Sequence, residues 1–195
     1  MLDRVVKDAL KVYFGIFYRV RIKGMENIPK EGGLILCANH VGQLDMFFIA
    51  YKIKRLVHFM AKAELYENPI VKWFLSNVGA FPVKRGTGDI GMARTVYKLL
   101  KNGKIVGIMP EGTRTKGKEN IKAKSGAAMF AISADVPIIP VGISGSYSLF
   151  SEVKVNIGKP YKLSVEGDKK PTQQELSDLS DELMTKIYAL VEGKE

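Results

Sequence analysis

Short apolar runs alternate with longer stretches of helical periodicity along most of this 195-residue chain. Short apolar runs are typical of buried strands, whereas apolar residues spaced three and four apart are typical of helices. Strands that alternate with helices build a sheet with helices packed on its faces. The sequence therefore predicts an α/β fold, and a length of 195 residues suits one domain with a substantial core.

The positions of the expected elements follow from these patterns. Strands are predicted at 34–38, 56–61, 78–83, 105–109 and 138–143, and helices at 44–51, 69–77, 89–102 and 125–134. Because most strands are followed by a helix, the sheet is expected to be mixed but mostly parallel and flanked by helices. No repeat, low-complexity tract or linker divides the chain, so residues 1–195 are predicted to form a single domain.

The two ends of the chain are also predicted to be helical. Residues 3–20 carry apolar side chains at helical spacing, with Lys and Arg on the remaining face. Such an amphipathic helix, expected within residues 1–22, suits either the headgroup layer of a membrane or packing on the domain core. Its apolar stretch is too short to cross a bilayer, which takes about 20 apolar residues. At the other end, Thr172 and Glu175 match a capping box, which predicts a helix over 171–192.

The net charge of the chain indicates which classes of partner it binds. Thirty Lys and Arg residues against twenty Asp and Glu give a formal net charge of +10, which favours nucleic acid, acidic lipid or a phosphorylated substrate. Aromatic residues are not interleaved with basic ones as in single-strand-binding surfaces, so no nucleic-acid partner is expected. The single cysteine, Cys37, excludes an internal disulfide and a zinc cluster of thiolates, and no metal site is predicted.

One histidine stands where α/β proteins place reactive groups. His40 follows the predicted strand 34–38, and Asp45 comes five residues later, in the first turn of the next predicted helix. Five residues along a continuous helix correspond to about 500°, so the two side chains meet only if His40 lies in the turn before the helix. A carboxylate on one ring nitrogen then leaves the other free to act as a base. The alternative is that Asp45 supports the helix start while His40 caps or packs.

Two further segments place cations at the ends of predicted strands. Arg85 ends the extended segment 79–85. After the strand 105–109 come a carboxylate, a glycine, a hydroxyl group and a guanidinium, followed by a lysine further along: Glu111, Gly112, Thr113, Arg114 and Lys124. These residue types favour a phosphate site, because the guanidinium fork matches phosphate oxygens. Each segment alone is more typical of a solvated basic loop.

The segment 136–141 is an unusual strand, because Pro137 and Pro140 bracket its apolar pair. Proline in a strand is confined to edges, ends or bulges. We therefore expect this strand either to lie at an edge of the sheet or to shape the wall of an apolar channel.

Four of these segments, in order, resemble a known family. Residues 39–45, 79–85, 109–115 and 136–141 are similar to the motifs of the glycerolipid acyltransferases typified by 1-acylglycerol-3-phosphate acyltransferase. The family patterns are N-H-x-x-x-x-D, G-x-F-x-x-x-R, F-P-E-G-T-R-S and V-P-I-x-P-V. Met109 and Thr115 depart from the third pattern, and neither departure removes a functional group that the chemistry needs.

The resemblance implies a role for each matched residue. It makes His40 the general base on an acceptor hydroxyl and Asp45 the residue that orients it. It assigns the acceptor phosphate to Arg85 and Arg114, in a pocket shaped by Glu111, Gly112 and Thr113. Lys124 is a further phosphate candidate, which we add from its position in the sequence, and backbone N–H groups near the helix start after His40 are candidates for an oxyanion site.

The resemblance also implies the partners of the reaction. The donor is an acyl-carrier protein or acyl-coenzyme A, and no bound cofactor is required. The acceptor is a lysophospholipid, first of all 1-acylglycerol-3-phosphate, which gives phosphatidic acid in phospholipid biosynthesis. Glycerol-3-phosphate or another lysophospholipid is the alternative acceptor. The expected location is the cytoplasmic face of the cell membrane, with the protein held peripherally or monotopically on an anionic surface.

Two competing hypotheses rest on other residues. The segment 86–91 matches the G-x-G-x-x-G fingerprint of dinucleotide-binding proteins, and Glu111 lies 20 residues beyond it. The preceding segment contains Pro82 and ends in Lys84-Arg85, which is poor context for that motif. Cys37, with His40 as base, suggests an acyl-cysteine intermediate, although a cysteine inside an apolar strand is usually a small hydrophobic residue. The second histidine, His58, is expected in the core or in a strand.

Overall fold

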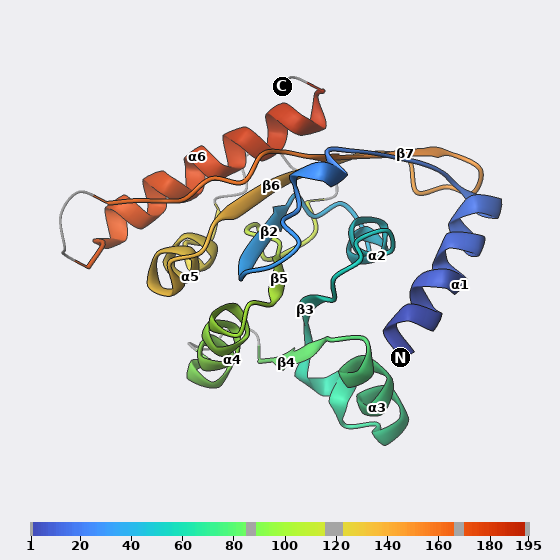
Figure 1. The fold of residues 1–195 in the computed structure, drawn as a ribbon, viewed down its shortest axis with the longest axis horizontal. Helices are drawn as coiled ribbons and strands as arrows, with labels where there is room; N and C mark the ends of the chain where they lie inside the picture. The colour runs from blue at the N-terminus through green and yellow to red at the C-terminus, as the bar shows by residue number, and fades with distance from the viewer. Residues whose placement is uncertain (1, 85–88, 116–122, 166–169, 194–195) are drawn as a thin grey trace.

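Seven strands form one sheet in the computed structural model, which describes residues 2–84, 89–115, 123–165 and 170–193 (Figure 1). The strands lie in the order β1-β7-β6-β2-β5-β3-β4, and every neighbouring pair is parallel except β6 and β7. Their bounds are β1 Arg19–Lys23, β2 Leu34–Ala38, β3 Val57–Lys62, β4 Phe81–Val83, β5 Ile105–Ile108, β6 Ile138–Gly145 and β7 Glu152–Ile157. The predicted α/β class and mostly parallel sheet are confirmed.

Helices cover both faces of this sheet. They are α1 Leu2–Phe17, α2 Asp45–Ala50, α3 Pro69–Asn77, α4 Ile90–Lys101, α5 Gly126–Ala134 and α6 Gln173–Val191, with 3₁₀ turns η1 Met25–Asn27 and η2 Ala63–Tyr66. Figure 1 shows α4, α5 and α6 to one side of the central strands and α1 and α2 to the other. No described helix is long and apolar enough to span a bilayer.

Strand β2 explains why the sheet needs both layers. All five of its side chains are buried. Leu34, Leu36 and Ala38 belong to the cluster that includes α1 and α2, whereas Ile35 and Cys37 belong to the cluster that includes α4, α5 and α6. A central parallel strand is buried on both faces and reads as a continuous apolar run, because successive side chains point to opposite faces.

Strands β1 and β7 are the elements that sequence patterns missed. We predicted a helix through residue 20, but α1 ends at Phe17, and Arg19 begins β1 with its N–H donating to the backbone oxygen of Ser151 at 3.0 Å. The sequence of β1 alternates charged and apolar residues, and its exposure alternates with it. An edge strand of this kind is stabilised by pairing with β7, more than 130 residues away, which no local pattern reports.

The expected edge position of the proline-containing strand is wrong. Strand β6 lies inside the sheet, between β7 and β2. Residues 141–145 of β6 pair with β7, and Ile138 forms a separate bridge with Tyr161. The hydrogen-bond ladder on this side of β6 is therefore interrupted at Pro140, which has no N–H to donate. Pro140 therefore lies where β6 changes from one pairing partner to the other, and not at an edge of the sheet.

The strand directions bring distant loops together. Strands β2, β3, β4, β5 and β6 run the same way, so their carboxyl ends meet at one edge of the sheet, which we call the carboxyl edge. The segments that follow β2, β5 and β6 therefore lie at this edge, where open α/β sheets bind ligands. Strands β1 and β7 run the opposite way, so the end of α1 that leads into β1 reaches the same edge.

Candidate active site

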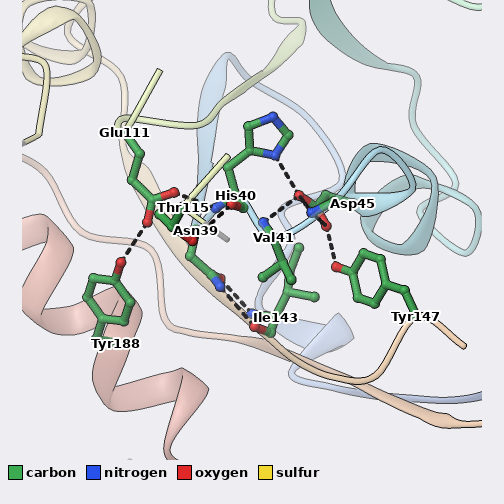
Figure 2. A network of polar contacts seen from close by, with 10 residues as sticks. Asn39, His40, Val41, Asp45, Glu111, Thr115, Ile143, Tyr147 and Tyr188 are labelled. Atoms are coloured by element: carbon green, nitrogen blue, oxygen red, sulfur yellow. Dashed lines mark hydrogen bonds and ion pairs between the residues drawn. The ribbon is translucent and has the colours of Figure 1, made fainter. Parts of the chain in front are cut away.

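The imidazole of His40 and the carboxylate of Asp45 meet at the carboxyl edge. His40 lies two residues after β2, in the turn before α2, and Asp45 is the first residue of α2. The Nδ1 atom of His40 lies 2.6 Å from Oδ2 of Asp45 (Figure 2). An ionised carboxylate only accepts hydrogen bonds, so Nδ1 carries the proton and Nε2 is left with a free lone pair. The geometry is the one required for a general base held by a carboxylate.

Asp45 is fully buried and its oxygens accept hydrogen bonds from several donors. The N–H of Val41 donates to Oδ2 at 2.9 Å, and the N–H of Gly42 donates to the two oxygens at 3.0 and 3.1 Å. These bonds fold the turn back on itself and bring His40 to Asp45 despite their spacing of five residues. They also occupy the two N–H groups that follow His40, which the sequence had suggested for an oxyanion site.

Tyr147 is a member of this site that sequence reasoning missed. Its hydroxyl donates a hydrogen bond to Oδ1 of Asp45 from the loop between β6 and β7 (Figure 2). Burial, together with this bond to a carboxylate, raises the pKa of Tyr147 above its ordinary value, so the phenol stays protonated as a donor. Its ring packs against that of Phe48, with centroids 5.2 Å apart.

Glu111 anchors the backbone of His40. One carboxylate oxygen accepts the N–H of His40 at 2.7 Å, and the other accepts the hydroxyl of Tyr188, on α6, at 2.7 Å. Burial raises the pKa of Glu111 above its usual range, and the two donors act in the opposite direction. Burial also raises the pKa of Tyr188 to about 12. Glu111 is buried and both of its oxygens are bonded inside the protein, so a ribose hydroxyl does not reach it, which removes the support for a dinucleotide site. Residues 86–88 of that fingerprint lie outside the described residues.

The loop after β5 also bonds to the backbone carbonyl of His40. The N–H and the hydroxyl of Thr115 donate to the backbone oxygen of His40 at 3.0 and 3.3 Å. Between Glu111 and Thr115, the side chains of Thr113 and Arg114 are exposed. The predicted histidine and the predicted cationic loop are therefore brought together, with Arg114 three residues from the residue that holds the His40 N–H.

Gly112 and Lys124 form a close pair at this loop. Gly112 has φ +66°, a left-handed conformation that favours glycine, and a Cβ there would lie 2.7 Å from Cε of Lys124. The N–H of Lys124 donates to the backbone oxygen of Pro110 at 2.8 Å. Lys124 thus lies over the turn that carries Arg114. Arg85, the other predicted phosphate ligand, lies outside the described residues.

The surroundings of three other polar residues indicate structural roles. The amide of the buried Asn39 donates to the backbone oxygen of Ile143 at 2.9 Å and accepts its N–H at 2.8 Å, which joins the end of β2 to β6. Cys37 is fully buried inside β2, and burial raises its pKa far above the ordinary value. His58 lies in β3, as expected, with Nδ1 2.9 Å from the oxygen of Gly79. Among the described residues, no cluster of three or more His, Cys, Asp or Glu side chains is suited to a metal ion.

Comparison with known proteins shows to which family the chain belongs. A family model described as "Acyltransferase" matches residues 19–144. A 1-acyl-sn-glycerol-3-phosphate acyltransferase of Bacillus subtilis (strain 168) is 33% identical over 189 residues, which are 94% of this chain and 94% of that protein. This chain belongs to the acyltransferase family. The resemblance drawn from the four sequence segments is confirmed.

Solved and curated relatives extend the comparison of this acyltransferase. The crystal structure of the 1-acyl-sn-glycerophosphate (LPA) acyltransferase PlsC from Thermotoga maritima superposes with a TM-score of 0.74 and 26% identity, over 96% of this chain and 79% of that one. A 1-acyl-sn-glycerol-3-phosphate acyltransferase of Borreliella burgdorferi is 29% identical over 134 residues, 68% of this chain and 54% of that protein. The family match contains His40, Asp45 and Glu111 but ends at residue 144. Tyr147 and Tyr188 of this acyltransferase therefore lie beyond it.

Proposed function

We propose that this acyltransferase moves a fatty acyl group from an acyl-carrier protein or acyl-coenzyme A to the free hydroxyl of 1-acylglycerol-3-phosphate and so makes phosphatidic acid. The observation that carries the proposal is the His40–Asp45 pair at the carboxyl edge, with Nε2 of His40 free of hydrogen-bond partners among the described residues. The similarity to 1-acyl-sn-glycerol-3-phosphate acyltransferases supports the choice of acceptor.

The proposed chemistry needs one proton carrier. Nε2 of His40 takes the proton of the acceptor hydroxyl while Asp45 stabilises the imidazolium that forms. The acceptor oxygen attacks the thioester carbonyl, and collapse of the tetrahedral intermediate forms the ester and breaks the carbon–sulfur bond. The proton held on Nε2 goes to the departing thiolate, so that His40 returns to its starting state.

The acceptor phosphate is assigned first to Arg114. Arg114 is exposed on the loop that is bonded to the backbone of His40. A guanidinium binds phosphate oxygens in a fork, and binding at a fixed distance from Nε2 holds the free hydroxyl at the base. We assign supporting roles to Thr113, to Lys124 over Gly112 and to Arg85. Glu111 contributes by holding the loop, since its two oxygens are already bonded.

A membrane surface is the proposed place of action. Helix α1 buries Phe14 in the core, yet Val5, Val12 and Ile16 remain exposed on another stripe of the same helix. Helix α3 follows the carboxyl end of β3, has no buried residue, and exposes Ile70, Trp73 and Phe74. Apolar side chains exposed on a protein of net charge +10 suit peripheral binding to an anionic membrane, which we place at the cytoplasmic face.

A panel of donors and acceptors tests the proposal. Purified protein receives labelled acyl-carrier protein or acyl-coenzyme A with 1-acylglycerol-3-phosphate, glycerol-3-phosphate, another lysophospholipid or a monoacylglycerol without phosphate. We expect transfer to 1-acylglycerol-3-phosphate, with kcat lowered about 10²–10⁴-fold in His40→Ala but not in His58→Gln. Preference for another acceptor would replace 1-acylglycerol-3-phosphate, and full activity of His40→Ala would end the general-base assignment.

A pair of arginine variants tests the phosphate site. Arg114→Ala is expected to raise KM for acceptors with a phosphate and to leave KM for the monoacylglycerol unchanged. The exposed Arg94, on α4, provides the matched control Arg94→Ala. An equal rise in KM for both classes of acceptor would show that Arg114 does not bind the phosphate.

A further inference from the structure

We propose that two tyrosine–carboxylate pairs, Tyr147–Asp45 and Tyr188–Glu111, position His40 for catalysis. The inference rests on the proposed function for the role of His40. Both tyrosines are positioning residues, because each acts on His40 through a carboxylate. Neither belongs to the segment that the family match covers.

The first pair fixes the imidazole ring. Oδ2 of Asp45 accepts the Nδ1–H of His40, and Oδ1 accepts the hydroxyl of Tyr147, so the two oxygens have different side-chain partners (Figure 2). A carboxylate bonded in this way cannot rotate without losing a buried hydrogen bond. Tyr147 itself is held by the ring of Phe48 and by Tyr18, whose hydroxyl donates to the backbone oxygen of Tyr147 at 3.4 Å.

The second pair fixes the backbone of the same residue. Oε2 of Glu111 accepts the N–H of His40, and Oε1 accepts the hydroxyl of Tyr188 (Figure 2). The backbone oxygen of His40 is bonded at the same time to Thr115. His40 is therefore held at its ring, its N–H and its carbonyl, and the hold on its N–H extends to helix α6.

The two pairs share one chemical design. In each, a buried carboxylate accepts His40 on one oxygen and a phenol on the other. A phenol is a neutral donor, so it holds the carboxylate without the cation that would cancel its charge. The negative charge of Asp45 then remains available to the imidazolium that forms during the reaction. Lys or Arg in place of Tyr147 would supply a competing positive charge.

Kinetics of phenylalanine variants test the two pairs. Tyr147→Phe and Tyr188→Phe are expected to lower kcat by about 10-fold or more with little change in KM, as for the loss of a hydrogen bond to a charged group. Tyr161→Phe is the matched control, because the buried hydroxyl of Tyr161 has no hydrogen-bond partner. Tyr188→Phe is expected to add little to the loss in Glu111→Ala, since either change removes the hydrogen bond between Tyr188 and Glu111. Additive losses, or kcat values equal to that of Tyr161→Phe, would overturn the second pair.

The pH dependence separates positioning from mere stability. Among the described residues, the ionisable groups bonded to His40 are Asp45 and Glu111; Tyr147 and Tyr188 are bonded to these two carboxylates, and the exposed Arg114 lies on the loop bonded to the His40 backbone. Without the phenol, Asp45 holds the imidazolium more tightly, so the acid limb of the pH–rate profile is expected to move to higher pH in Tyr147→Phe. A loss of kcat with an unmoved profile and a lowered melting temperature would mean that Tyr147 is only structural, which would overturn the first pair.

A spectroscopic readout keeps this inference separate from the proposed function. The chain has two histidines, so the Nδ1–H signal of His40 in ¹⁵N-histidine-labelled protein is assigned by its loss in His40→Gln. We expect the signal to shift in Tyr147→Phe and to stay in place in Tyr161→Phe; an unchanged signal in both would overturn the first pair. A protein that transfers no acyl group, but in which this shift occurs, would refute the proposed function and leave the pair standing.

Discussion

Gly42 lies so close to Tyr147 that a Cβ atom at residue 42 would come within 2.5 Å of the Cε2 atom of the tyrosine ring. The N–H of Gly42 also donates to both oxygens of Asp45. The glycine thus provides a hydrogen bond to the carboxylate and the space in which the phenol reaches it. Residue 42 is an x position of the N-H-x-x-x-x-D pattern, but its neighbours leave no room for a side chain.

We expect Gly42→Ala to displace Tyr147 from Asp45. The ring is packed against Phe48 and cannot yield freely, so the variant is predicted to lose about 10-fold or more in kcat and about 1–3 kcal/mol of unfolding free energy. Kinetics and denaturant unfolding measure both. Gly15→Ala, on α1, is the control, because nothing lies within 4 Å of its added Cβ. Equal behaviour of the two variants would show that the contact is unimportant.

Cys37 is predicted to be dispensable for catalysis. Its thiol is fully buried within β2, and burial raises its pKa, so no thiolate is available to attack a thioester. Cys37→Ala should keep kcat within about twofold and lose about 1 kcal/mol of stability. Steady-state kinetics beside thermal unfolding check this. A folded Cys37→Ala protein as inactive as His40→Ala would restore the acyl-cysteine mechanism.

Glu111 is expected to make stability depend on pH. Burial raises its pKa above the ordinary value of 4.5, so the folded protein binds this proton more tightly than the unfolded chain. Its contribution to the free energy of unfolding is then fully present below about 4.5 and declines as the pH rises through the folded-state pKa. Relative to Glu111→Gln, the wild type should lose stability over that window. Denaturant unfolding at a series of pH values, with the exposed Glu64→Gln as a charge control, measures the difference, and a rise with pH would contradict it.

Trp73 provides an intrinsic probe of membrane contact, since the chain has a single tryptophan and its side chain is 60% exposed on α3. We expect its fluorescence to shift to the blue when anionic vesicles are added, as an indole does when it enters the headgroup layer. Ile70→Ala should weaken vesicle binding about 10-fold, because a buried isoleucine side chain contributes about 1.5–3 kcal/mol relative to an exposed one. The control is Tyr97→Ala, an exposed aromatic residue on α4. Vesicle binding without a change in Trp73 emission would remove α3 from the contact.

The central strands and the helix caps were predictable because their signals are local. Strand β2 reads as an apolar run because it is buried on both faces. Helix α6 begins where the capping box of Thr172 and Glu175 predicts, since each side chain bonds to the backbone of the other. The edge strand β1 was missed, because its alternating charged residues become a strand only by pairing with β7.

The sequence by itself determined the layered α/β fold and the family to which the chain belongs, and it left the contact between His40 and Asp45 as one of two interpretations, which the structure decided. Only the tertiary structure decided that Tyr147, 102 residues from Asp45, and Tyr188, 77 residues from Glu111, complete the surroundings of His40. The physical reason is the separation along the chain over which each kind of interaction acts. Periodicity, capping and turns are set by neighbours in the chain, whereas a hydrogen bond to a buried carboxylate is set by which strands and helices pack together. The sequence around a single tyrosine after the last motif does not indicate which carboxylate its hydroxyl will bond to.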